Sequence, residues 1–260
     1  MYLFFYAPIA VLVAFSFNDS PIVGDWEGLT FRWYGDLARN DEVREAIWVS
    51  VKVALGSTVI SVVLGTLSAL SLERFRWRGQ RVFDAVLYLP IIIPDVTMAV
   101  MMLVFFSEAS AWLEWIPGVD LRSGLETLVL SHVAFNISFV SVVVRARLAS
   151  LDDDLEEAAA DLYATRWQTF RHITLPQVMP GVLGGALLAI TLSLDDVVVS
   201  SFVSAIGSTP LAVFVFGLVR KGVTPLINAV SVAMLAASIL LILASMFFQR
   251  ATSSPDEGRP

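Results

Sequence analysis

The polar stretch 149–180 reads ASLDDDLEEAAADLYATRWQTFRHITLPQVMP, and it separates two apolar segments that are long enough to cross a membrane. Its acidic start favours the N-terminus of a helix, because negative charge stabilises that end of the helix dipole. Asp153 and Glu156 have the spacing of a capping box. Asp154 and Glu157 offer an alternative register, and the alanines that follow are strong helix formers. The first half of the stretch therefore predicts a short helix.

A second short helix is predicted at about 165–173. Trp167, Phe170 and Ile173 lie on one face of this helix. Pro176 is expected to end it, since proline cannot donate the hydrogen bond that the next turn needs. The whole stretch thus predicts a helical hairpin with an aromatic face. That face could meet a partner protein or pack on the protein's own helices, and the residues alone leave both interpretations open.

The composition is that of an integral membrane protein. Of the 260 residues, 57% are hydrophobic and 16% are charged, and the mean hydropathy is +0.74. Apolar segments alternate with polar loops, which predicts an all-α protein with a single transmembrane domain over 1–260. Six transmembrane helices are predicted at 2–17, 46–72, 84–106, 126–147, 181–203 and 226–248, with 149–180 as a cytoplasmic loop.

Two apolar segments need separate interpretation. The segment 2–17 could be a signal peptide, but no basic residue precedes it and no small-x-small cleavage site follows it, so a membrane span is favoured. The segment 211–219 is too short to span a bilayer. It predicts an interfacial or re-entrant helix.

Arginine clusters predict which loops face the cytoplasm. Four arginines lie within 73–81, directly after one span, and Arg145 and Arg147 end another span. Short loops that are rich in Lys and Arg lie on the cytoplasmic side of a membrane. With six spans, both termini are then also predicted to be cytoplasmic.

The residue types that are missing exclude several classes of protein. There is no cysteine, so neither a disulfide nor a thiolate metal site can form. The only histidines are His132 and His172, and no metal site is expected. The lysines, Lys52 and Lys221, do not follow a glycine, so the phosphate-binding loop G-x-x-x-x-G-K-[ST] is absent. With no catalytic Ser/His/Asp set either, the chain is predicted to be non-catalytic and to depend on another chain for ATP-driven work.

Two adjacent acids interrupt the apolar segment 181–203, where ionisable residues are costly and mark functional sites. On a continuous helix, Ser193, Asp196 and Ser200 share one face and predict a polar stripe along a substrate pathway. Asp195 points about 100° away from that face. It is predicted to cap or brace a neighbouring element.

A further candidate acid, Asp95, lies in the segment 84–106, where Pro90 and Pro94 are expected to break or kink the helix. The only arginines in the spans, Arg145 and Arg147, lie at the cytoplasmic end of one span, so no arginine inside the membrane pairs with these acids. Charge complementarity therefore favours a cationic substrate. The alternative is that the acids are structural and bind kinked backbone or a partner subunit. Asn136 is interpreted as an interhelical hydrogen bond rather than a ligand contact.

The polar stretch also contains a spaced pattern. Its members are Glu157, Ala158, Ala159, Tyr163, Ile173, Leu175 and Pro176. The pattern resembles the EAA loop of ABC-importer permease subunits, which implies the type I ABC importer permease fold and a coupling helix that docks in a cleft of an ATPase subunit. Tyr163 departs from the family, which usually has glycine there. Either the turn has a different geometry or Tyr163 adds a docking contact.

A second resemblance covers nearly the whole chain. It rests on LSLDDVVVSSFV at 192–203, Pro94-Asp95, RFRWRG at 74–79 and Trp33-Tyr34. These segments resemble the PotC-type permeases of bacterial spermidine/putrescine importers. The resemblance implies a polyamine permease of the bacterial inner membrane.

The same resemblance implies partners. These are a dimer of ATPase subunits that holds ATP and Mg, a paralogous permease and an extracytoplasmic substrate-binding protein, while this chain binds no cofactor and no nucleic acid. The loop with Trp33 and Tyr34 is the candidate contact for the binding protein. A permease for another small solute, such as an amino acid, a sugar, thiamine or a metal ion, is an alternative. An ion-coupled carrier that uses Asp95 and Asp196 is another, although such carriers often contain internal repeats and none is clear here.

Overall fold

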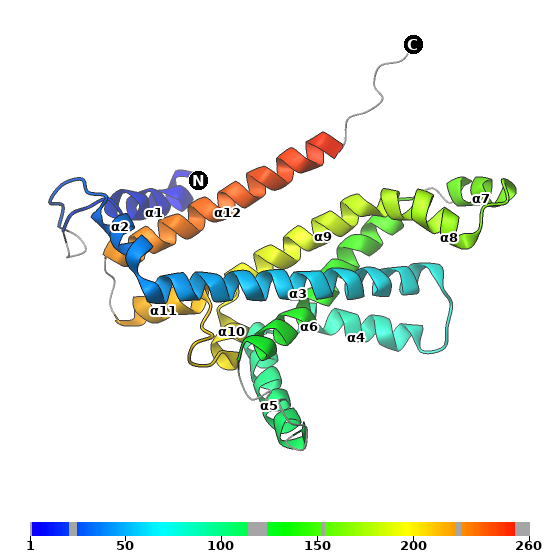
Figure 1. Ribbon diagram of the computed structural model, residues 1–260, viewed down its shortest axis with the longest axis horizontal. Helices are drawn as coiled ribbons and strands as arrows, with labels where there is room; N and C mark the ends of the chain where they lie inside the picture. Colours follow the sequence, from blue (N-terminus) through cyan, green and yellow to red (C-terminus); the bar gives the residue numbers. More distant parts are fainter. Residues whose placement is uncertain (1, 21–24, 114–123, 152–153, 222–224, 253–260) are drawn as a thin grey trace, which may run out of the picture. The chain divides into compact units, whose positions relative to one another are not determined.

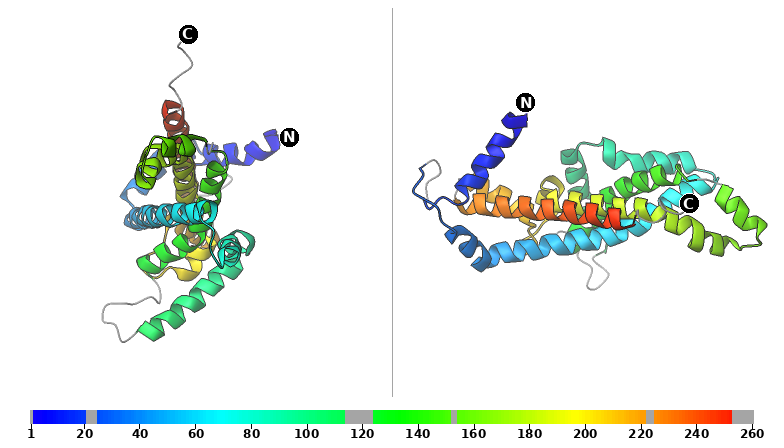
Figure 2. Two further views of the ribbon diagram at one scale, coloured as in Figure 1. Left: turned by 90° about the vertical axis from the view of Figure 1, so that its right-hand side faces the viewer. Right: turned by 90° about the horizontal axis from the view of Figure 1, so that it is seen from above.

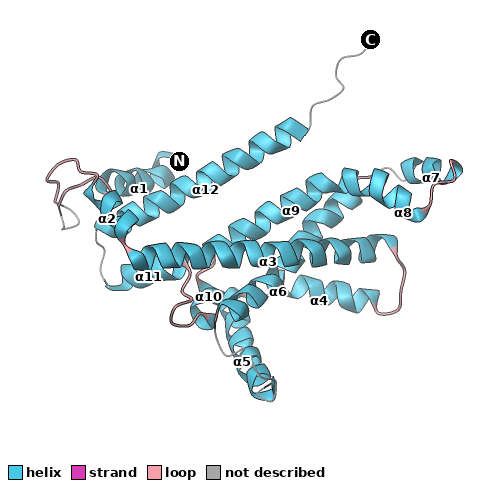
Figure 3. Cartoon of the chain, viewed as in Figure 1, coloured by secondary structure: helices cyan, strands magenta, loops and turns pink. Residues whose placement is uncertain are grey.

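The computed structural model describes residues 2–20, 25–113, 124–151, 154–221 and 225–252. Within these residues the chain is helical, apart from loops and one isolated β-bridge between Asn18 and Leu29 (Figure 3). It divides into two compact units. We call Val51–Ala205 the central unit and Met1–Ser50 with Ile206–Pro260 the terminal unit.

The central unit holds most of the long helices, and α3 enters it from the terminal unit (Figure 1). Its helices are α3 (Asp41–Arg74), α4 (Gln80–Ile92), α5 (Asp95–Leu113), α6 (Leu125–Leu148), α7 (Asp154–Asp161), α8 (Arg166–Thr169), α9 (Leu175–Asp195) and α10 (Val198–Val203). The terminal unit contains α1 (Tyr2–Phe15), α2 (Arg32–Arg39), α11 (Leu211–Lys221) and α12 (Pro225–Thr252). Within that unit α12 packs against α1, α2 and α11 (Figure 2).

Four helical segments in the described part of the chain are long and apolar enough to cross a membrane. They are Asp41–Arg74, Asp95–Trp112, Leu125–Leu148 and Arg166–Asp195. Shorter apolar helices lie at Phe4–Phe15, Leu211–Arg220 and Pro225–Leu240. Each of the six predicted spans therefore coincides with apolar helix, and the all-α membrane fold is confirmed. The short helix predicted near 211–219 is also present, as α11.

The predicted span 84–106 is not one straight helix. It is shared by α4 and α5, which run in different directions (Figure 1). Ile93 between them has an extended backbone, with φ −70° and ψ 132°, because a residue before proline avoids the helical region. The predicted break at Pro94 is confirmed, whereas Pro90 lies inside α4 and does not end it.

The prediction that Pro176 ends the second helix of the hairpin is wrong. Helix continues from α8 through one π-helical turn, Phe170–Thr174, into α9. In that turn the Leu175 N–H donates to the Phe170 carbonyl, five residues earlier. The wider winding leaves room for the proline ring, which in a regular helix clashes with the carbonyl four residues before it. We call this continuous segment, Arg166–Asp195, the rod.

The predicted span 181–203 also consists of two helices. α9 ends at Asp195, Asp196 has an extended backbone with φ −69° and ψ 120°, and α10 begins at Val198. The polar stripe predicted along this span does not form, because its members do not share one helix.

In the core of the central unit, α6 lies between α3 and α9. Val140 of α6 is fully buried and contacts both neighbours where they carry glycine. A Cβ atom on Gly65 would lie 2.8 Å from Val140, and one on Gly185 would lie 3.2 Å from it. Glycine thus lets three helices approach closely, which provides the packing that drives helix association in a membrane.

Candidate functional site

One cavity in the central unit collects the three acids that the sequence predicts. It has a volume of about 310 Å³ and is lined by residues of α4, α5, α6, α9 and α10 and of the break between α9 and α10. Asp95 of α5, Asp195 of α9 and Asp196 of the break all line it. Phe135 and Phe139 line it as well, and none of its lining residues is basic. The cavity therefore combines negative charge with aromatic rings.

Asp196 organises the break between α9 and α10. Its Oδ1 accepts the Val199 N–H at 3.2 Å and its Oδ2 accepts the Ser200 N–H at 2.7 Å. These N–H groups belong to the first turn of α10 and have no partner within the helix. The capping role that the sequence assigned to Asp195 thus belongs to Asp196, because the helix breaks between the two acids.

Asp95 and Asp195 are exposed side chains of the same cavity. Asp95 begins α5 and Asp195 ends α9. Among the residues that the structure describes, neither acid forms a salt bridge, and no three acids or histidines are close enough to hold a metal ion. The carboxylates are thus distributed around the cavity rather than gathered at one point.

Behind Asp196 lies a fully buried histidine that the sequence patterns did not single out. His132 Nε2 is 3.0 Å from Ser200 Oγ and 3.6 Å from Asp196 Oδ2. Its ring packs on Phe135, with 5.1 Å between the ring centroids, and Phe135 lines the cavity. His132 thus connects α6 to the α9–α10 break. The sequence signal that could have identified His132 is its spacing from Asn136, because residues four apart share one face of a helix.

The predicted pathway serines are buried between helices. Asn136 Nδ2 donates to Ser193 Oγ at 2.9 Å, and Ser57 Oγ of α3 is 3.1 Å from the same oxygen. Ser193 and Ser200 are not among the residues that line the cavity. The interhelical hydrogen bond predicted for Asn136 is confirmed. Ser193 and Ser200 hold α9 and α10 on their neighbours, and direct contact of either serine with a substrate stays a prediction.

The hairpin of α7 and α8 encloses an apolar groove with a volume of about 480 Å³. Leu155, Ala158, Ala159 and Leu162 line it from α7, and Ile173 lines it from the rod. Three members of the EAA-type pattern therefore meet at one groove. The next members of the pattern lie at the start of α9, where Leu175 is half-buried and Pro176 is exposed.

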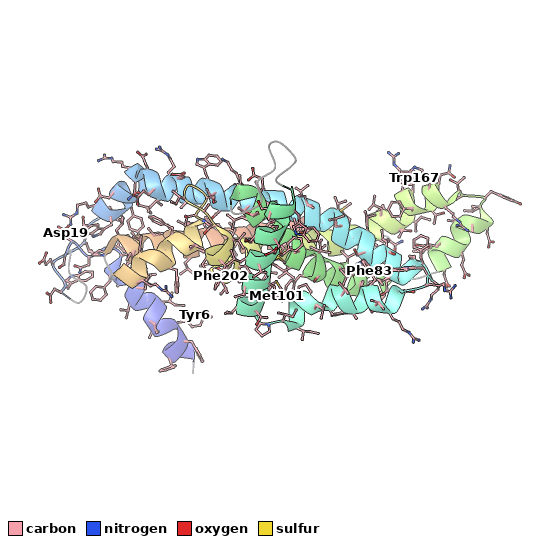
Figure 4. All side chains as sticks on the ribbon, turned by 90° about the horizontal axis from the view of Figure 1, so that it is seen from below. Tyr6, Asp19, Phe83, Met101, Trp167 and Phe202 are labelled. Atoms are coloured by element: carbon pink, nitrogen blue, oxygen red, sulfur yellow. The ribbon has the colours of Figure 1, made fainter. Side chains whose placement is uncertain are left out.

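Large apolar side chains are exposed on the hairpin, and Trp167 is one of them (Figure 4). Trp167 is 66% exposed and its ring lies 5.7 Å from the ring of Phe170, while Leu162 is 81% exposed. Exposed apolar patches mark interaction sites. Of the predicted aromatic face, Trp167 is exposed, whereas Phe170 is half-buried and Ile173 lines the groove inside the hairpin. Contact of Trp167 with a partner stays a prediction.

Tyr163 lies in the turn between α7 and α8 with a φ of 61°, a conformation that glycine adopts most readily. Its N–H donates to the Ala160 carbonyl, and the Ala164 N–H donates to the Ala159 carbonyl, both at 3.0 Å. These two bonds form a Schellman motif with Tyr163 at the position usually taken by glycine. The turn keeps the geometry that glycine would give it, so the alternative of a different geometry is wrong.

Two neighbouring glutamates of α7 have different environments. Glu156 is half-buried and binds Arg74 and Thr174, whereas Glu157 is exposed and has no salt-bridge partner in the part of the chain that the structure describes. Glu156 is therefore committed to contacts outside α7 rather than to a capping box, and Asp153, its predicted partner there, lies outside the described residues. Glu157, the acid of the EAA-type pattern, faces solvent.

The candidate contact for a binding protein, Trp33 with Tyr34, lies in the terminal unit. The Trp33 indole N–H donates to the Asn18 carbonyl at 2.7 Å, and the Tyr34 hydroxyl is 2.8 Å from the hydroxyl of Ser16. Both side chains thus hold the loop that follows α1. Among the described residues of this loop, the large apolar side chains that are exposed are instead Trp26, Leu29 and Phe31.

Relatives that are similar over most of both chains include two permease proteins. "Putrescine transport system permease protein PotI" of Escherichia coli (strain K12) is 42% identical over 235 residues, which are 90% of this chain and 82% of that protein. "Spermidine/putrescine transport system permease protein PotC" of Haemophilus influenzae is 37% identical over 250 residues, which are 96% of this chain and 93% of that protein.

The fold is also similar to that of a solved bacterial ABC transporter involved in the import of the acidic polysaccharide alginate. The TM-score is 0.79 and the identity is 19%, over 97% of this chain and 91% of that one. The predicted importer permease fold is therefore confirmed. Residues 61–254, which include the cavity acids and the hairpin, match the family described as "Binding-protein-dependent transport system inner membrane component". The chain belongs to this family of inner membrane transport components.

Proposed function

We propose that the chain is a permease subunit that conducts polyamines through an ATP-driven importer and forms half of its pathway. The observation that carries the proposal is the cavity of about 310 Å³, lined by three acids, two phenylalanines and no basic residue. Opposite charge attracts a cation to such a cavity, and aromatic ring faces attract it further. An anionic cargo is disfavoured for the same reason.

Polyamines fit this cavity because they carry several ammonium groups separated by methylene groups. Asp95, Asp195 and Asp196 are spread around the cavity, and within the described residues they form no cluster of metal ligands. Separate carboxylates can each receive one ammonium group, while Phe135 and Phe139 cover the methylene chain. The relatives named for putrescine and for spermidine support the same class of cargo.

The rod supports coupling between the hairpin and the cavity. Its 30 residues extend for about 45 Å at the rise of a helix, and its last residue, Asp195, lines the cavity. A displacement of the hairpin therefore reaches the cavity wall without an intervening loop. An ATPase subunit that binds the exposed face around Glu157, Tyr163 and Trp167 drives this displacement.

The proposal implies an importer with four kinds of component. They are this chain, a paralogous permease, a pair of ATPase subunits and an extracytoplasmic binding protein, and the description of the family supports the last of these. ATP and Mg are held by the ATPase chains, so hydrolysis is not the task of this chain. The arginines that end α3 and α6 favour a cytoplasmic hairpin, and with six spans both termini are then cytoplasmic.

Proteoliposomes that contain the complete complex test the cargo. Uptake of labelled spermidine and putrescine is measured with ATP inside the vesicles and with the binding protein outside. We expect ATP-dependent uptake that unlabelled polyamines suppress and that excess sulfate, thiamine, neutral amino acids and Mg²⁺ leave unchanged. Uptake of one of those solutes that polyamines fail to suppress would falsify the polyamine assignment.

A further inference from the structure

Glu156 connects three segments that are distant in the sequence. Arg74 donates from Nη1 to Glu156 Oε2 at 3.0 Å and from Nη2 to Glu156 Oε1 at 2.8 Å. Thr174 Oγ1 donates to Glu156 Oε1 at 2.7 Å. Paired bonds between a guanidinium and a carboxylate are strong and fix the relative orientation of both groups. Both charged side chains are only about a quarter exposed, which limits their screening by water.

The positions of these residues show that the contact connects separate helices. Arg74 is the last residue of α3, Glu156 lies in the first turn of α7, and Thr174 ends the π-helical turn of the rod and is buried. One carboxylate of α7 therefore binds α7 to α3 and to the rod at the same time. We call this set of three residues the clasp.

The neighbouring side chains extend the same connection. Arg145 of α6 binds Glu73 and Asp84, and Arg147 donates to the Gln177 carbonyl of α9 at 2.9 Å. These contacts bind α6 to α3, α4 and α9. The clasp joins α7 to this set of helices.

We infer that Glu156 is the positioning residue that makes α7 of the hairpin move with α3 and the rod as one body. This inference rests on the proposed function, since it takes an ATPase as the source of the motion. Without the clasp, a force on α7 would be absorbed at the turn around Tyr163, where the chain reverses between α7 and α8. Glu157, one residue away, contacts the ATPase and has no part in the clasp.

The test is a charge exchange in the complete complex, reconstituted in proteoliposomes. Glu156→Arg and Arg74→Glu are each expected to lower polyamine uptake by about tenfold, because each leaves two like charges face to face. The double variant Glu156→Arg/Arg74→Glu restores the opposite pair and is expected to recover to within about threefold of the wild type. The ATPase should stay attached in all three variants. The number of polyamines moved per ATP is therefore expected to fall in the two single variants and to recover in the double variant.

Two matched variants separate the clasp from ATPase docking. Thr174→Val removes the hydroxyl at nearly constant volume and is expected to lower the number of polyamines moved per ATP. Thr174→Ser retains the hydroxyl and is the matched control. Glu157→Lys is expected to release the ATPase, and an intact Glu157→Lys complex would contradict the proposed function while the clasp variants still report on the clasp. Uptake within twofold of the wild type in either single variant, or a double variant no better than the single ones, overturns the inference.

Discussion

The cavity and the hairpin lie at opposite ends of the same rod, and both are rich in acids, yet the acids are used differently. At the hairpin end, Glu156 is bound by Arg74, and Arg145 is bound to two acids. At the cavity end, Asp95 and Asp195 are exposed and have no basic partner among the described residues. Acids beside arginine hold helices together, whereas acids without arginine are available to a cationic ligand.

Asp196 combines both uses. It lines the cavity, but both of its oxygens accept N–H groups of α10 and His132 lies behind it. Asp195 next to it lines the cavity without such contacts. The two neighbouring acids therefore allow ligand binding and helix organisation to be separated by experiment.

The largest effect is expected for Asp196→Asn. The variant removes a charged acceptor whose hydrogen bonds contribute about 1.5–3 kcal/mol each, so the initial rate of polyamine uptake should fall by about tenfold or more. The amide can accept at only one of its two terminal atoms, so α10 should also lose stability. Uptake assays and thermal unfolding of the purified complex measure the two effects.

Asp195→Asn serves as the comparison within this pair. It is expected to raise the KM for spermidine by about threefold and to leave the unfolding temperature unchanged, because it removes only a solvent-exposed charge. Asp161→Asn, which removes an exposed acid of α7, controls for the change in net charge. If Asp195→Asn destabilises the protein as much as Asp196→Asn does, the division of roles is wrong.

An intermediate effect is expected for His132→Phe. The phenyl ring retains the contact with Phe135 but loses the hydrogen bond to Ser200, which contributes about 1 kcal/mol and corresponds to about a fivefold rise in KM. His132→Gln keeps a polar group near Nε2 and should recover part of the affinity. A fall in maximal rate with an unchanged KM in both variants would show that His132 does not position Asp196.

Features that depend on neighbouring residues could be predicted from the sequence. Pro94 divides its span because the residue before proline avoids the helical region, and α7 forms where alanines follow a run of acids. Asp95 and Asp196 were singled out because a charge is costly in a membrane, and both line the cavity. Each of these predictions needs only residues that are close in the sequence and the cost of placing a charge in a membrane.

Features that depend on distant partners could not be predicted. Arg74 and Glu156 are 82 residues apart, and no pattern in the sequence pairs them rather than another arginine and acid of the same loops. The rule that proline ends a helix also failed at Pro176, since the π-helical turn before it is an alternative that propensities do not describe. The break at Asp196 then changed which serines could face the cavity.

The smallest effect is expected for Tyr163→Gly at the hairpin. A left-handed conformation costs a non-glycine residue about 1–2 kcal/mol, while glycine loses about 0.5–1 kcal/mol more backbone entropy on folding, so stability should rise by about 1 kcal/mol or less. The Schellman turn is retained, and only the side chain is lost, at a residue that is 94% exposed. Thermal unfolding and retention of the ATPase on the purified complex measure the two consequences.

Two further variants distinguish the ring from the turn. Tyr163→Phe retains the ring and should hold the ATPase as the wild type does, whereas Tyr163→Ala loses the ring and keeps the backbone cost. If the ring is a docking contact, Gly and Ala should weaken ATPase retention by the same modest factor, about twofold to fivefold for a single peripheral aromatic contact. If Ala weakens retention and Gly does not, the turn geometry limits docking, and tyrosine at this position makes no favourable contact. Tyr163 would then serve the hairpin through its backbone conformation, as Glu156 does through its contacts with Arg74 and Thr174, whereas the acids of the cavity serve through side chains that are free to bind.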